Sequence, residues 1–182
     1  LEGKYPFLYK VIGRISRYLI DFNDYSADKF VFAAVKDFFV SSRYLPKVYK
    51  YSAYNTWNRN INIFCTLGMV DKVPLDMLGR TRMRRAIREK KKVASGLGIK
   101  AENLKEVNFY RIPLYDAFTL EEANKRARIM LSKNFRMGGF SKVFLIKAFG
   151  KELADKVFPD DREVTAYSDY VVIEIERFVL NE

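Results

Sequence analysis

The chain has 182 residues, of which 49% are hydrophobic, and its 33 Lys and Arg against 22 Asp and Glu give a net charge of +11. This composition supports one good core or two small ones and excludes a disordered chain. The positive charge predicts a polyanionic partner, such as nucleic acid or an acidic membrane. A single Cys excludes an internal disulfide, and the absence of His excludes Ser-His-Asp and Cys-His nucleophiles and the common His-rich metal sites.

No apolar run reaches the roughly 18 residues that a membrane span needs. We find no signal peptide with a small-residue cleavage site. We therefore expect a cytoplasmic, nucleoid-associated protein that has no membrane partner, no cofactor, no metal and no catalytic residue.

Two helices are predicted before residue 42. Residues 5–21 place seven apolar side chains on one face at three- and four-residue steps, opposite three basic ones, which predicts an amphipathic helix that packs on the core. FNDYS at 22–26 predicts a polar turn, in which Ser26 or Asp24 can cap a second helix at about 27–41.

Two helices and then two strands are predicted next. Pro46 suits the start of a short helix around 47–51. Residues 52–67 predict the third helix from residue 27 onward, with Ser52 as its N-cap and Gly68 as its stop. Short strands are predicted at 69–73 and at 107–115.

This order of elements, and above all the passage IFCTLGMVDKVP at 63–74, resembles the winged helix-turn-helix superfamily. That family commonly ends its recognition helix in a Leu-Gly pair before the first wing strand. The resemblance covers residues 26–115 and implies a DNA-binding domain. It departs from the usual short wing, because a basic insertion at 75–106 separates the two strands.

Beyond residue 116 the chain is predicted to be helical. Thr119 and Glu122 form a capping box for a helix at 120–133, and Ser141 can cap another that runs to Phe149. Gly150 interrupts before a helix at 151–157, and the tail from 165 to 180 fits a helix better than a strand. A degenerate second winged helix in this half remains an open alternative.

The predicted fold is therefore mainly α: a winged helix-turn-helix core with a long basic insertion in its wing, and a C-terminal helical subdomain. The predicted divisions are 1–25 for the N-terminal amphipathic helix, 26–116 for the winged helix and 117–182 for the helical subdomain.

The third helix carries two contrasting stripes. Its core side is predicted to be Tyr54, Trp57, Ile61, Phe64 and Cys65, and its other side, here called the amide face, consists of Asn55, Asn58, Arg59, Asn62 and Thr66. Each Asn lowers the stability of a helix by roughly 0.5 kcal/mol relative to Ala. Helix propensity therefore does not explain the three Asn residues on this face. Asn and Arg can bond adenine and guanine edges, and Thr can contact a thymine methyl, so these five residues are predicted to contact bases. The alternative is a solvated face that happens to be rich in Asn.

Residues 80–92, RTRMRRAIREKKK, hold eight basic residues and one acid. Cations held within reach of phosphates release counterions when they bind, so this run is predicted to contact the DNA backbone, together with basic residues around the short helix. The predicted backbone contacts are Arg43, Lys47, Lys50, Arg80, Arg82, Arg84, Arg85, Arg88, Lys90, Lys91 and Lys92.

These features predict a non-enzymatic protein that reads double-stranded DNA, in transcriptional control or in replication or transfer of a mobile element. A homodimer or a larger replication or transcription assembly is the expected further partner. One alternative is a winged-helix docking module whose partner surface is the aromatic-rich helix at 5–21. Another is an RNA-binding domain, although clustered aromatic platforms in strands are lacking.

Overall fold

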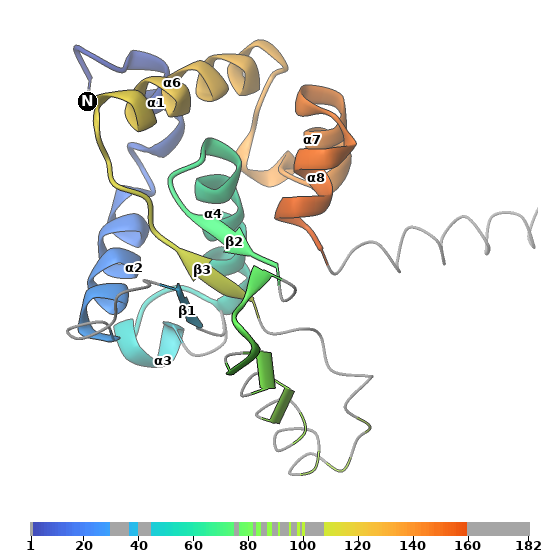
Figure 1. Cartoon of the computed structure of the whole chain (residues 1–182). Helices are drawn as coiled ribbons and strands as arrows, with labels where there is room; N and C mark the ends of the chain where they lie inside the picture. The colour runs from blue at the N-terminus through green and yellow to red at the C-terminus, as the bar shows by residue number, and fades with distance from the viewer. Residues whose placement is uncertain are drawn as a thin grey trace, which may run out of the picture. The chain divides into compact units, whose positions relative to one another are not determined.

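A computed structural model describes residues 2–29, 37–39, 45–74, 77–81, 83, 84, 87, 88, 91, 95, 98, 100 and 108–159. These residues are mainly helical and include one small antiparallel sheet (Figure 1). The chain divides into two compact units, Leu1–Phe140 and Ser141–Glu182.

The N-terminal region forms two helices, α1 (Pro6–Ile12) and α2 (Ser16–Lys29), in place of the single helix predicted at 5–21. The chain turns between them, where the Ile15 N–H donates to the Ile12 carbonyl. The polar turn predicted at 22–26 is wrong, because these residues lie inside α2 and both Phe22 and Ser26 are buried. Burial of this turn of helix against the core outweighs its weak helix propensity.

The sheet contains β1 (Asp37–Phe39), β2 (Asp71–Val73) and β3 (Phe109–Arg111). Strand β3 lies between the other two and is antiparallel to both, so that Tyr110 is opposite Phe38 and Lys72. The strands predicted at 69–73 and 107–115 are therefore confirmed with shorter bounds. The helix predicted at 27–41 is wrong at its C-terminal end, since residues 37–39 pair with β3 and the Phe38 ring packs on Phe22, with 5.2 Å between centroids.

Helices α3 (Leu45–Tyr49) and α4 (Tyr54–Leu67) follow β1, and α4 contacts α2, α3 and α6. Trp57, Ile61 and Phe64 are buried, as predicted, whereas Tyr54 is 44% exposed and lies outside the core. Gly68 ends α4 in the left-handed region at φ 77°, which confirms the predicted stop.

Asp116 is the N-cap of helix α6 (Ala117–Ser132), and its side chain accepts a hydrogen bond from the Thr119 N–H. The predicted capping box is therefore wrong: Thr119 supplies the backbone donor and Asp116 supplies the cap. A short 3-10 helix, η3 (Met137–Gly139), follows.

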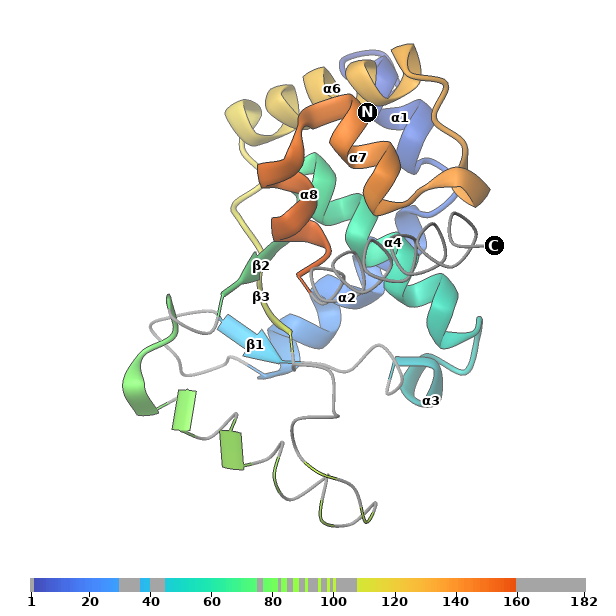
Figure 2. The ribbon, with the colours of Figure 1, turned by 90° about the vertical axis from the view of Figure 1, so that its right-hand side faces the viewer.

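Helix α6 also holds α1 in place. The Asn124 side-chain oxygen accepts hydrogen bonds of 3.0 Å from the N–H groups of both Phe7 and Leu8, and α1 and α6 lie side by side in both views (Figures 1 and 2). Because α6 packs against α1 and α4, residues 117–140 belong to the first compact unit. The division predicted after residue 116 lies after Phe140 instead.

The second unit begins with α7 (Lys142–Phe149) and α8 (Lys151–Val157). The Ser141 hydroxyl caps α7 by accepting from the Phe144 N–H, and Lys142 pairs with Asp155 at 2.7 Å. The predicted cap and the predicted break at Gly150 are confirmed. The helix predicted at 165–180 lies outside the described residues.

Candidate nucleic-acid interface

The amide face of α4 is exposed to solvent in the N-terminal half of the helix and buried in the C-terminal half. Asn55 and Asn58 are exposed, and Arg59 is partly buried. Every side chain from residue 60 to residue 67 is buried, with Asn62 at 2% and Thr66 at 0% exposure. The prediction that Asn62 and Thr66 contact bases is therefore wrong for this structure, because a buried side chain cannot reach a base edge.

Polar groups in the buried C-terminal half of α4 form hydrogen bonds within the chain. The Thr66 hydroxyl donates to the Asn62 carbonyl at 2.9 Å. The Arg126 guanidinium, from α6, donates to the Thr66 carbonyl at 3.1 Å. The C-terminal half of α4 is thus part of the junction with α6.

Several buried polar atoms of α4 have no hydrogen-bond partner among the described residues. They are the Arg59 Nε, both amide atoms of Asn60, and the Asn62 side-chain oxygen. Each such atom costs roughly 1 to 3 kcal/mol relative to a satisfied one. Packing in the core therefore does not account for the polar side chains of this helix.

The turn before α4 differs from the predicted cap. Ser52 adopts φ 61° and its hydroxyl hydrogen-bonds the Tyr18 hydroxyl, so Ala53 takes the N-cap position without a side-chain bond. Lys50 also has a positive φ, of 54°, and both Lys47 and Lys50 are exposed, so each remains a candidate for the predicted backbone contacts. Arg43 lies outside the described residues.

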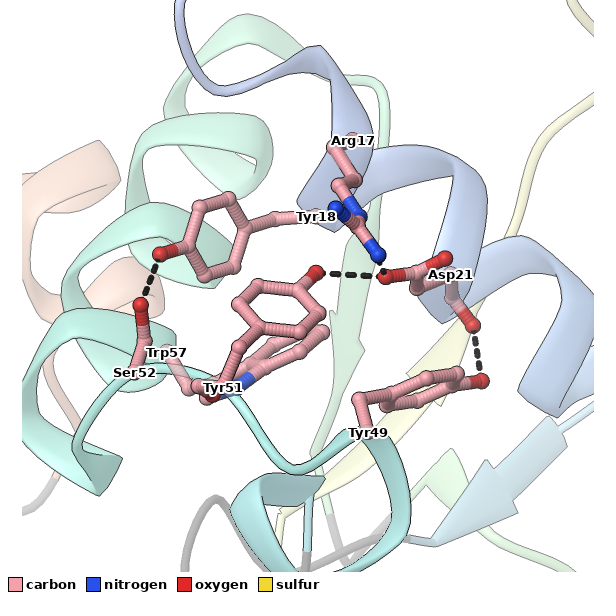
Figure 3. A network of polar contacts seen from close by, with 7 residues as sticks. All are labelled: Arg17, Tyr18, Asp21, Tyr49, Tyr51, Ser52 and Trp57. Atoms are coloured by element: carbon pink, nitrogen blue, oxygen red, sulfur yellow. Dashed lines mark hydrogen bonds and ion pairs between the residues drawn. The ribbon is translucent and has the colours of Figure 1, made fainter.

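A network of polar and aromatic contacts joins α2 to this turn (Figure 3). The Tyr51 hydroxyl donates to an Asp21 carboxylate oxygen at 2.5 Å, and the Tyr49 hydroxyl donates to the Asp21 backbone carbonyl at 2.5 Å. The same carboxylate oxygen lies 3.8 Å from the Arg17 Nε. Burial, followed by the hydrogen bond to Asp21, raises the pKa of Tyr51 above its ordinary value, so this hydroxyl keeps its proton and donates.

Trp57 completes the network from α4. Its Nε1 donates to the Tyr51 carbonyl at 3.3 Å, and its ring lies 4.8 Å from the Tyr18 ring and 5.5 Å from the Tyr49 ring. The predicted site residues do not include this cluster. The four-residue spacing of Arg17 and Asp21 signals their ion pair, but no sequence pattern signals their contact with Tyr51.

The basic insertion is described at scattered positions. Helical backbone occurs at 80, 81, 83, 84, 87, 88, 91 and 95. Arg80, Arg84, Arg88 and Lys91 are all exposed there, at the spacing of one helix face. Arg82, Arg85, Lys90 and Lys92 lie outside the described residues.

Three features lie at one end of the first unit. In Figures 1 and 2, helix α3, the N-terminal end of α4 and residues 77–81 lie at the end opposite α1 and α6. The N-terminal end of α4 and the start of the basic insertion therefore lie at the same end of the unit.

The comparisons with known proteins give no family. No protein-family model, curated protein or solved structure matches this chain. None of the described helices combines the length and apolar character that a bilayer crossing requires.

Proposed function

We propose that this protein binds double-stranded DNA as a winged helix-turn-helix protein. The chain order α2, β1, α3, α4, β2, β3, with β3 between β1 and β2, supports this fold. In such a fold α4 is the recognition helix, and the connection between β2 and β3 is the wing, here extended by the basic insertion.

The main support for this proposal is the exposed part of the amide face, in the N-terminal half of α4. A recognition helix contacts base edges mainly through its N-terminal residues, and Asn55 and Asn58 are exposed there. The proposed readout set is therefore Asn55, Asn58 and the partly buried Arg59. An exposed Asn can bond both the N6 and the N7 of adenine in the major groove.

Exposed cations supply the phosphate contacts. Lys47 and Lys50 lie just before α4, and Arg80, Arg84, Arg88 and Lys91 form a line on the insertion. Phosphate contacts fix the register of the protein on the duplex and make binding steeply dependent on salt. Transcriptional control and the replication or transfer of a mobile element would both use this interface.

Selection from a random duplex library tests the proposal. The parent protein should enrich a defined site, and the double variant Asn55→Ala/Asn58→Ala should lose preference at about 1 to 3 kcal/mol for each base contact removed. Asn62→Ala is the matched control, since it removes an amide from the same helix at a buried position. It should select the parent's site. If the Asn55→Ala/Asn58→Ala variant selects the same site as the parent, the readout role is disproved.

Docking to another protein is the second candidate function. The surface expected for it, the apolar face of 5–21, is not available, because Leu8, Val11 and Ile12 are buried. Exposed apolar side chains at the N-terminal end of α6 favour docking there instead: Leu114 is 81% and Phe118 is 74% exposed. A docking module would show no preference for duplex DNA over other polyanions.

A single-stranded or hairpin RNA competitor tests the RNA-binding alternative in the same assay.

A further inference from the structure

We propose that Arg17 of α2 contacts a DNA phosphate beside the N-terminal end of α4. This inference rests on the proposed DNA binding and adds a contact from a helix outside both α4 and the wing. The basic residues of α2 did not enter the predicted interface.

The Arg17 guanidinium is both exposed and oriented. Its side chain is 76% exposed, yet its central carbon lies 4.7 Å from the centroid of the Tyr51 ring and its Nε lies 3.8 Å from the Asp21 carboxylate. Contact with the ring face and the carboxylate restricts the side chain without covering it (Figure 3). Such a side chain loses less rotational entropy when it binds a ligand.

The donor geometry leaves room for a phosphate. A guanidinium has five N–H donors, and the Arg17 Nε lies 3.8 Å from the Asp21 carboxylate, which is beyond hydrogen-bond distance. The Asp21 oxygen already accepts from the Tyr51 hydroxyl, so it is committed to the network whether or not Arg17 turns away. A phosphate that approaches from solvent can take the two terminal nitrogens together, as Arg often binds oxyanions.

The position of Arg17 links it to the proposed recognition helix. The next residue, Tyr18, hydrogen-bonds Ser52 and stacks edge-on against Trp57 in the first turn of α4. Arg17 therefore lies over the turn that leads into α4, where Lys50 is also exposed. Residues that flank a recognition helix are where a duplex presents its backbone.

A purely structural role is the weaker explanation. Exposed ion pairs contribute little to stability, and this pair is long. If Arg17 only supported the fold, its loss would change unfolding and leave the salt dependence of DNA binding unaltered.

The test compares Arg17→Gln with the parent and with Lys133→Gln, which removes an exposed charge at the far end of α6. The affinity for a fixed duplex is measured as a function of salt. Loss of one phosphate contact should reduce the slope of log K against log salt by about 0.9, whereas Lys133→Gln should leave it unchanged. Arg17→Lys should keep the slope, because it keeps the charge.

The outcomes separate the two proposals. If the parent binds duplex DNA and Arg17→Gln has the parent's slope, the Arg17 contact is disproved and the DNA-binding proposal stands. If the parent does not bind duplex DNA above its affinity for heparin, both proposals fail. Equal slopes for Arg17→Gln and Lys133→Gln, both below the parent, would mean that only net charge matters and would also disprove the contact.

Discussion

Arg126 donates a hydrogen bond to the backbone carbonyl of Thr66, at 3.1 Å, and so joins α6 to the last turn of α4. The last carbonyls of a helix have no partner within it and carry the negative end of its dipole. A guanidinium there satisfies one carbonyl and supplies a favourable charge. The contact couples a segment that follows the sheet to the proposed recognition helix.

Arg126→Met should destabilise the first unit by about 1.5 to 3 kcal/mol, because it removes a charge-assisted hydrogen bond and keeps most of the apolar stem. Urea unfolding followed by circular dichroism measures the loss. Lys125→Met is the control on the neighbouring exposed position, whose partner is Glu122 on the same helix. An equal loss in both variants would assign the effect to helix charge rather than to Thr66.

Gly68→Ala should cost about 1 to 2 kcal/mol. An added Cβ would lie 3.4 Å from Arg126 Nη1, and the φ of 77° is strained for any L side chain. Gly79→Ala is the matched control. No heavy atom of the described residues beyond its chain neighbours lies within 4 Å of its added Cβ, and its φ lies outside the left-handed region. Thermal unfolding of both variants checks the result, and equal midpoints would contradict it.

Asn124→Ala should weaken α1, because the Asn124 oxygen accepts from two backbone N–H groups at the start of that helix. The expected cost is about 1 to 2 kcal/mol, the range for loss of an N-cap. Asn124→Asp should retain stability, since a carboxylate accepts the same bonds and favours the positive end of the dipole. Hydrogen exchange at Phe7 and Leu8 measures the loss locally; unchanged protection in Asn124→Ala would rule out the cap.

Tyr115 should make stability fall at alkaline pH. Burial raises the pKa of its hydroxyl to about 12, while an unfolded tyrosine titrates near 10. The unfolded state therefore loses its proton first, and the contribution of Tyr115 is full below pH 10 and disappears as pH rises through 12. Tyr115→Phe loses the bond to the Met69 carbonyl, so it should be about 1 kcal/mol less stable than the parent at pH 8.

This difference between Tyr115→Phe and the parent should shrink as the pH approaches 12. Denaturant unfolding at pH 8, 10 and 11.5 checks the trend, and comparison with the parent cancels the titration of the other tyrosines. A constant difference across these pH values would show that Tyr115 has an ordinary pKa.

Asn60→Leu should be neutral or stabilising by about 1 kcal/mol. The Asn60 side chain is completely buried, and neither of its amide atoms has a partner within the part of the chain that the structure describes. An apolar side chain of the same branching therefore removes a desolvation cost. Ile61→Asn, at the adjacent buried position, is the opposite change and should destabilise strongly. A loss of more than 2 kcal/mol in Asn60→Leu would indicate that the amide has a partner, such as a bound water.

The sequence by itself determined the mainly helical character, the C-terminal end of α4 and most of its apolar stripe. Each of these is a local property: periodicity at three- and four-residue steps identifies one buried side, and glycine readily adopts the left-handed conformation at a helix end. The cap and bounds of α7 follow from local signals in the same way.

Only the tertiary structure decided which part of the amide face is exposed to solvent. Periodicity identifies the apolar stripe of a helix but not the width of surface that its neighbours cover, and α6, whose Arg126 bonds Thr66 across 60 residues of sequence, packs against α4. The same holds for β1, which pairs with a strand about 70 residues later, and for the Arg17 network, which joins three helices and a turn. Long-range packing is decided by the sum of contacts between distant segments, and no local pattern in this sequence encodes it.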